Sequence, residues 1–301
     1  MRTKLANTQR PIAGWPLTNS VPSIHKLLCA SFLVVAFLTA IASSPSCAAE
    51  PLRIVSFNTL WKGQSDPNCA NVARMMSGSG AHIIALQEVR HAQTATNLCN
   101  ALGWRWSCAT APPASENCVH YAFLWDKSRC KLIPDTHNPI VWPEGETDAF
   151  RRPPFIIGLR DGISGRSYWL IDVHLYFGSN GSSSVAERKE ELRFLERIYT
   201  IFEKRVPNVY VLILGDFNLP LKDIQAENLT FKAYQSSKTT LLRKGNGYSE
   251  SYDHFAFNDR LQSDLKPTFR SLNVIKRFFH NDFTLYRNTV SDHIPICMEV
   301  Q

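Results

Sequence analysis

The clearest feature of the hydrophobic pattern is Val209–Leu214, six apolar or aromatic residues of which half are β-branched. A run of this length and composition predicts a strand that is buried on both faces. Gly215 allows a close approach or an unusual backbone dihedral, and Pro220 ends the strand. Asp216 and Asn218 lie two positions apart, so an extended backbone would direct both to the same side, where they could hold a metal, a water or a phosphate oxygen. The alternative is an ordinary Asp-Asn turn after a core strand.

Other short apolar segments extend this pattern along the chain. Roughly ten strands with few helices between them predict packed sheets with helices outside, rather than a simple doubly wound sheet. The segments that we expect to form strands, besides Val209–Leu214, are Leu52–Asn58, His82–Leu86, Val119–Trp125, Lys131–Pro134, Phe155–Leu159, Ser167–Val173 and Ile294–Val300.

Helical periodicity is clearest over Val185–Lys204. Ser184 and Glu187 have the spacing of a capping box at its start. One face of the segment is apolar and is formed by Leu192, Leu195, Tyr199 and Phe202. Asn68–Ser77 and Ala92–Leu102 are also predicted to be helical.

The first 49 residues have the pattern of an export signal. They contain no acidic residue, carry Arg2, Lys4, Arg10 and Lys26, and continue into the 15-residue apolar run Leu27–Ile41 and a tail of small residues. The run is shorter than the about 20 residues of a membrane-spanning helix, which favours cleavage near Ala48–Ala49 and no stable membrane insertion afterwards. We therefore expect an exported protein, secreted or periplasmic. The long basic region keeps a signal anchor open as an alternative.

Removing residues 1–49 changes the charge of the protein. This segment holds four of the 33 basic residues and none of the 26 acidic residues, so 29 and 26 remain, a net charge of +3. This small excess does not by itself indicate a nucleic-acid ligand. Residues 50–301 are enough for one sizeable core, and we expect them to form a single catalytic domain.

Six cysteines remain in residues 50–301, and no pair has C-x-x-C spacing. In an exported protein this predicts structural disulfide bonds rather than a zinc site. Cys108 with Cys118 would close a short loop, and Cys69 with Cys99 would join two early helices. The sequence leaves the connectivity of these six cysteines, which include Cys130 and Cys297, open.

Polar residues that could take part in chemistry lie at six strand boundaries. Each alone could be a turn residue, a solvated strand end or a hydrogen-bonded core histidine. Together they supply hard oxygen ligands for Mg²⁺, Mn²⁺ or Ca²⁺ and imidazoles for proton transfer. They are Asn58, Glu88, His174, Asp216 with Asn218, Asp253, and Asp292 with His293.

Seven motifs in one order give the chain a resemblance to a known family. They are SFNTLW at 56–61, ALQEV at 85–89, RRPPF at 151–155, DVHLYFG at 172–178, LGDFN at 214–218, SYDHF at 251–255 and SDHIPI at 291–296. The chain resembles the deoxyribonuclease I-like endonuclease/exonuclease/phosphatase superfamily, and the Arg-Pro-Pro motif resembles its secreted nuclease branch. The resemblance implies an α/β (α+β) fold, a four-layered α/β/β/α sandwich of two mainly antiparallel sheets with outer helices.

The resemblance also implies roles for the residues that match the motifs. Asn58, Glu88 and Asp292 match positions at a bound metal, Mg²⁺ or alternatively Mn²⁺ or Ca²⁺. His293 matches the histidine that activates water, and Asp253 would orient it.

The phosphate side of the site is implied in the same way. His174 matches the histidine that contacts phosphate, and Asp216 and Asn218 match the pair that positions the nucleophile and a phosphate oxygen. Arg152, with Arg151 as the alternative, resembles the arginine that contacts substrate phosphate. A glutamate pairs with the second histidine in the secreted branch, but our alignment puts Val119 there, with Glu116 and His120 nearby.

The function implied is a divalent-metal-dependent phosphodiester hydrolase. An exported endonuclease acting on DNA rather than RNA is our first expectation. The alternatives are a phosphodiesterase or phosphatase acting on lipid head groups, similar to sphingomyelinases, and a binding module with an inactive site.

Overall fold

Alternate side chains of strand β1 (Leu52–Asn58) pack into two different apolar layers. Leu52 and Ile54 face one layer, and Val55 and Phe57 face the other. Successive side chains of a strand point to opposite faces, so this strand is covered on both sides. Strand β8 (Tyr210–Asp216) behaves in the same way, as its continuous apolar run predicts.

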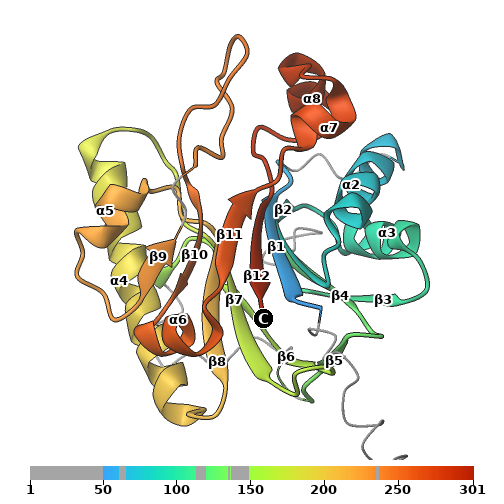
Figure 1. The fold of residues 1–301 in the computed structure, drawn as a ribbon. Helices are drawn as coiled ribbons and strands as arrows, with labels where there is room; N and C mark the ends of the chain where they lie inside the picture. The colour runs from blue at the N-terminus through green and yellow to red at the C-terminus, as the bar shows by residue number, and fades with distance from the viewer. Residues whose placement is uncertain (1–49, 61–65, 113–119, 135, 137–148, 235–236) are drawn as a thin grey trace, which may run out of the picture. The chain divides into compact units, whose positions relative to one another are not determined.

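The computed structural model describes residues 50–60, 66–112, 120–134, 136, 149–234 and 237–301. In these residues, two six-stranded sheets pack face to face (Figure 1). The first has the order β11 (Thr268–Ser271), β12 (Ile296–Val300), β1, β2 (Ile83–Val89), β4 (His120–Asp126) and β3 (Trp106–Thr110). The second has the order β5 (Cys130–Leu132), β6 (Phe155–Asp161), β7 (Ser167–His174), β8, β10 (Asp253–Phe257) and β9 (Lys232–Tyr234).

Helices cover the outer face of each sheet (Figure 1). Helices α2 (Asp66–Ser79) and α3 (Ala92–Leu102) lie on the first sheet, and α4 (Ser182–Arg205) and α5 (Leu221–Gln225) on the second. Three further short helices in the described residues are α6 (Asp259–Leu265), α7 (Val274–Phe279) and α8 (Phe283–Thr289). The expected four-layered sandwich is confirmed. None of the helices in the described residues combines the length and apolar character needed to cross a membrane.

One edge of the sandwich collects the ends of the central strands. β1 and β2 run parallel, as do β7 and β8, so these strands finish at the same edge. The antiparallel neighbours β12 and β10 start there, and Asp253 on β10 lies opposite Asp216 on β8. The polar residues that the sequence placed at strand boundaries are therefore brought to one edge by the sheet topology.

Two local predictions are wrong. Helix α4 begins at Ser182 after Gly181, with no side-chain cap, so Ser184 and Glu187 lie inside the helix and form no capping box. Asn218 has a φ of 50° and is not on extended backbone, so it is not placed beside Asp216 by strand alternation. Instead its main-chain N–H donates to Asp216 Oδ1 (2.9 Å), which makes the two residues a turn.

The structure holds the described cysteines of the domain as thiols, Cys69, Cys99 and Cys108 among them. The expected Cys69–Cys99 bridge is therefore not formed, and Cys108 is a thiol as well. Cys118, its expected partner, lies outside the described residues.

Gly215 is required where β8 passes β7. Its φ is +137°, and a Cβ added there would lie 2.0 Å from the carbonyl oxygen of Val173. Both the unusual dihedral and the close approach expected from the sequence are confirmed.

We expect Gly215→Ala to lower the free energy of unfolding by at least about 3 kcal/mol, because it adds a backbone collision to the strain of a positive φ. Gly245→Ala is the matched control, since Gly245 has φ +82° and open space around its Cα. It should cost about 1 kcal/mol, from strain alone. Denaturant unfolding measures both, and equal losses would contradict the collision.

Candidate active site

Most of the predicted site residues line one cleft of about 520 Å³ at the shared sheet edge. Those in its wall are Glu88, Arg152, His174, Asp216, Asn218, Asp292 and His293. Asn58 and Asp253 are fully buried beneath it and are hydrogen-bonded to residues of the wall. The structure therefore brings the whole predicted set together.

Asn58 links the two sheets at this edge. Its Nδ2 donates to Glu88 Oε1 (3.1 Å) and to Asp216 Oδ2 (3.0 Å), while its Oδ1 accepts the N–H of Leu60 (2.9 Å). Glu88 lies in a β-bulge between Gln87 and Val89 and has a φ of 55°. A bulge redirects a side chain, and here it turns Glu88 toward the cleft.

His293 is held by an acid on the other sheet. Its Nδ1 lies 2.8 Å from Asp253 Oδ2, which leaves Nε2 directed at the cleft, 3.7 Å from Asp216 Oδ2. Its main-chain N–H donates to Ser291 Oγ, and its carbonyl accepts the hydroxyl of Tyr286. The orientation expected for Asp253 is present in the geometry.

His174 is positioned through its main chain. Its N–H donates to the hydroxyl of buried Tyr121 (3.0 Å), and that hydroxyl also lies 3.3 Å from the carbonyl of Arg152. The ring Nε2 is 3.7 Å from Glu88 Oε1 and 3.6 Å from Asp216 Oδ2, beyond hydrogen-bonding distance.

The two histidines have opposite protonation preferences. Burial lowers the pKa of His174 well below its ordinary value, and the charges of Arg152 and His293 add to this. Burial opposes the charged form of His293 as well, but Asp253 and Asp216 outweigh it and raise its pKa to about 10. Burial also raises the pKa of Glu88 and, against the effect of His293, that of Asp216. Without a bound cation, His174 is neutral and His293 is an imidazolium.

A single carbonyl fixes two phosphate-binding candidates relative to each other. The oxygen of Leu175 accepts from Arg152 Nη2 (2.9 Å) and from Asn218 Nδ2 (2.8 Å). Arg151 is different: its guanidinium lies over the ring of Tyr176 and does not line the cleft. The structure therefore favours Arg152 over Arg151 as the arginine of the site.

The donor set of the cleft fits a hard divalent cation. Glu88 and Asp216 direct carboxylate oxygens to the same point, around Asn58 Nδ2. Asp253 Oδ1 and Asp292 Oδ1 are buried and accept no hydrogen bond from a described residue. Asp216, Asp253 and His293 also offer ligand atoms within 4.8 Å of one another. Asn58 presents its amide nitrogen to the carboxylates, so it would bind a cation through oxygen only after its amide turned over.

The sequence did not predict the residues whose hydrogen bonds position the main chain around the site. Tyr121 supports His174, and buried Glu191 accepts the main-chain N–H groups of both Arg151 (2.8 Å) and Tyr176 (2.7 Å). Ser291 Oγ donates to the carbonyl of Asn58 (2.7 Å) as well as accepting from His293. Ser291 was within a recognised motif, whereas Glu191 looked like any helical glutamate. Glu116 and Val119 lie outside the described residues.

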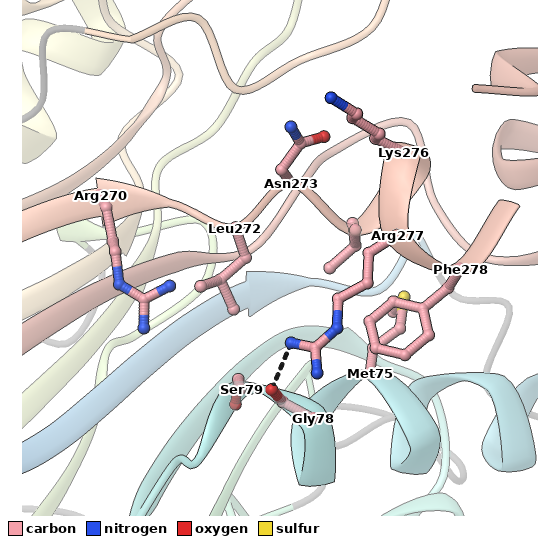
Figure 2. A pocket seen from close by; sticks show the side chains of 10 residues that line it. Met75, Gly78, Ser79, Arg270, Leu272, Asn273, Lys276, Arg277 and Phe278 are labelled. Atoms are coloured by element: carbon pink, nitrogen blue, oxygen red, sulfur yellow. Dashed lines mark hydrogen bonds between the residues drawn. The ribbon is translucent and has the colours of Figure 1, made fainter. Parts of the chain in front are cut away.

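A second groove lies between the C-terminal part of α2 and the segment from β11 to α7 (Figure 2). Its floor is apolar, and Arg270, Lys276 and Arg277 surround it. Arg277 donates to the carbonyl of Gly78 (2.7 Å) and its guanidinium lies over the ring of Phe278. No predicted site residue lines this groove.

Comparisons with known proteins agree with this geometry. Residues 55–293 match the model of the Endonuclease/Exonuclease/phosphatase family. No curated protein sequence matched the chain.

Three solved structures show the likeness in fold. Bacteroides thetaiotaomicron mannosyl-6-phosphatase has a TM-score of 0.60 at 13% identity, over 83% of this chain and 99% of that one. The human Nocturnin catalytic domain with bound sulfate has a TM-score of 0.57 at 15% identity, over 84% of this chain and 93% of that one. D. rerio TDP2 complexed with single-strand DNA product has a TM-score of 0.57 at 16% identity, over 83% of this chain and 99% of that one.

We expect Asp253→Asn to move the pKa of His293 from about 10 toward its ordinary value of 6.5, because the neighbouring charge is lost. Mg²⁺ added to the wild-type protein should also lower this pKa, since a bound cation repels the imidazolium. NMR titration of the ring proton measures both, with the signal assigned through His293→Gln. The signal of His82, which precedes β2 at its other end, is the control. A His293 titration that Asp253→Asn leaves unchanged would contradict the pairing.

Proposed function

The chain belongs to the endonuclease/exonuclease/phosphatase family, whose members hydrolyse phosphate esters, and on that premise we propose that it is a divalent-metal-dependent phosphodiester hydrolase. We further propose that it is an exported endonuclease, secreted or periplasmic, that acts on DNA. The convergence of Glu88, His174, Asp216 and His293 on one cleft carries the proposal.

The cleft supplies what phosphodiester cleavage needs. A phosphodiester is anionic and repels an attacking hydroxide, so charge must be neutralised and a nucleophile oriented. A divalent cation held by the carboxylates of this edge would act as a Lewis acid on a phosphate oxygen. The family is typically dependent on such a cation, and Mg²⁺ is our choice for this chain.

His293 is placed to move a proton at the cleft. Asp253 accepts from Nδ1, so Nε2 is the atom that can take a proton from water. The ring must first lose the proton that its raised pKa retains. A positive charge near Glu88 and Asp216 favours the loss of this proton. Binding of a cation at these carboxylates would therefore convert His293 to the neutral form that can act as a base.

His174, Arg152 and Asn218 form the opposite wall. Neutral His174 can donate a hydrogen bond from Nε2 to a phosphate oxygen as charge develops there. Arg152 carries a permanent charge, and its Nε is buried without a partner among the described residues. Such a group can stabilise a phosphoryl oxygen bidentately, which lysine cannot.

Two features support nucleic acid as the substrate. The N-terminal 49 residues and the Arg152-Pro-Pro motif resemble the secreted nuclease branch. Arg270, Lys276 and Arg277 line the groove of Figure 2, and several cationic side chains along one groove suit a long polyanion better than a small ester. One similar structure, TDP2, was solved with a single-strand DNA product.

A lipid head group is the second candidate. Tyr176 and Phe177 are partly exposed beside His174, and the ring of Phe177 lies 6.4 Å from that of Tyr252. Aromatic rings of this kind can bind a quaternary ammonium group such as that of choline.

Excess EDTA should abolish conversion of supercoiled plasmid to the open-circular form, and Mg²⁺ or Mn²⁺ should restore it. The same protein should release little phosphocholine from sphingomyelin vesicles. Full nicking activity in EDTA would contradict the proposed metal dependence. Hydrolysis of sphingomyelin faster than that of plasmid DNA would make the lipid, and not DNA, the proposed substrate.

His174→Ala should lower kcat for plasmid nicking by about 10²–10³-fold, because a donor to the developing charge is lost. Arg152→Gln should act similarly, whereas the adjacent Arg151→Gln should have a much smaller effect. The melting temperature of each variant checks that folding is retained. A folded His174→Ala variant with wild-type kcat would remove this residue from the mechanism.

A further inference from the structure

Two cysteines, Cys99 on α3 and Cys108 on β3, lie where this helix packs against this strand. Helix α3 packs against β3, and the neighbouring Cys108 thiol adds to the effect of burial in raising the pKa of Cys99 to about 12, so the two side chains lie near each other. Cys99 is buried and Cys108 is half-buried. Both belong to the apolar layer between the first sheet and the helices that cover it.

Local geometry explains why these two thiols meet. Cys99 lies on the buried face of α3 with Thr94, Ala95 and Leu98. On β3, Trp106 and Cys108 alternate with Ala109, which faces the layer between the two sheets. Alternation therefore directs Cys108 at α3.

The two residues are also level with each other. The chain reverses at Gly103, whose carbonyl accepts the N–H of Trp106 (3.0 Å). Cys99 lies three residues before the end of α3, about 4.5 Å along the helix axis. Cys108 lies two residues after the start of β3, about 6.6 Å along the strand. Figure 1 shows α3 lying against β3.

We propose that Cys99 and Cys108 form an intramolecular disulfide bond when the protein meets a small-molecule disulfide oxidant. The bond would tie β3, the edge strand of the first sheet, to the helix that covers it. This replaces both pairings favoured by the sequence. It does not depend on the catalytic activity, because neither cysteine lines the cleft.

The reaction balances as a thiol–disulfide exchange with glutathione disulfide. The half-buried Cys108 loses its proton, and its sulfur attacks the oxidant and releases one glutathione thiolate. Cys99 then loses its proton, and its sulfur attacks that of Cys108 and releases the second glutathione. Two protein thiols are oxidised by two electrons, and one glutathione disulfide is reduced to two glutathione molecules.

Two of the other described thiols, Cys297 and Cys130, are poorly placed to compete. Cys297 lies on β12, and the three strands β1, β2 and β4 separate it from β3. At about 4.8 Å between strands, this is several times the reach of a disulfide. Cys130 lies on β5 in the second sheet. Cys69 on α2 is the competitor to be tested, since α2 packs against α3.

Peptide mapping of the native full chain, incubated with glutathione disulfide and then alkylated, tests the proposal. Trypsin cuts after Arg90 and Arg105, and a glutamate-specific protease cuts after Glu116. These cuts separate Cys99, in peptide 91–105, from Cys108, in 106–116, and from Cys118, in 117–127. We expect 91–105 joined to 106–116, with Cys130 and Cys297 alkylated.

Any other pattern of linked peptides would contradict the proposal. A link from 91–105 to the Cys69 peptide, a link between 106–116 and 117–127, a stable glutathione adduct on Cys108, or full alkylation would each do so. In Cys108→Ser, peptide 91–105 should be recovered unlinked, while Cys118→Ser should keep the Cys99–Cys108 link.

The melting temperature is an independent measurement. Oxidised wild-type protein should melt several degrees higher than the same protein kept reduced. Cys108→Ser should melt at the same temperature in both conditions. An equal oxidation-dependent rise in that variant would also overturn the proposal. Cys99→Ser fills the same role if Cys108→Ser does not fold.

Discussion

The site depends on buried hydrogen bonds that join the two sheets at one edge. Asn58 on the first sheet donates to Asp216 on the second, and Gln87 donates to Asp172 at 2.6 Å just beneath. Burial raises the pKa of Asp172 well above its ordinary value, which favours its neutral form. Buried polar groups must be paired, and slippage between the sheets would break both links. Apolar side chains fill the sandwich, but these bonds set its register where the chemistry lies.

Charge balance in the cleft follows from the same convergence. Asp253 and Asp216, both on the second sheet, hold the proton of His293, while burial, Arg152 and His293 keep His174 neutral. The largest charge effects on each histidine come from groups on other strands, and Asp292, the sequence neighbour of His293, adds a smaller one. A bound cation would reverse part of this balance. Cation binding and proton transfer are thus linked through Asp216, which contacts both sides of the site.

Long apolar segments were sufficient to predict the core of the fold. The bounds of β1 and α3 agree with the sequence pattern, and β8 is buried on both faces as its composition indicates. The short strands β3, β9 and β11 were missed, because three to five residues carry too little periodicity. Those strands form through pairing with neighbours that are distant in sequence, which a local pattern does not contain.

The sequence by itself determined which side chains are available for chemistry, because residue type and the strand-end position of each can be read directly along the chain. Only the tertiary structure decided how they are oriented: the turn that joins Asp216 to Asn218, the amide of Asn58 that faces its carboxylates, and the support of Tyr121 and Glu191. It also decided which cysteines are neighbours. The physical reason is that these contacts form between segments brought together by sheet pairing and packing, whose partners lie tens to hundreds of residues away.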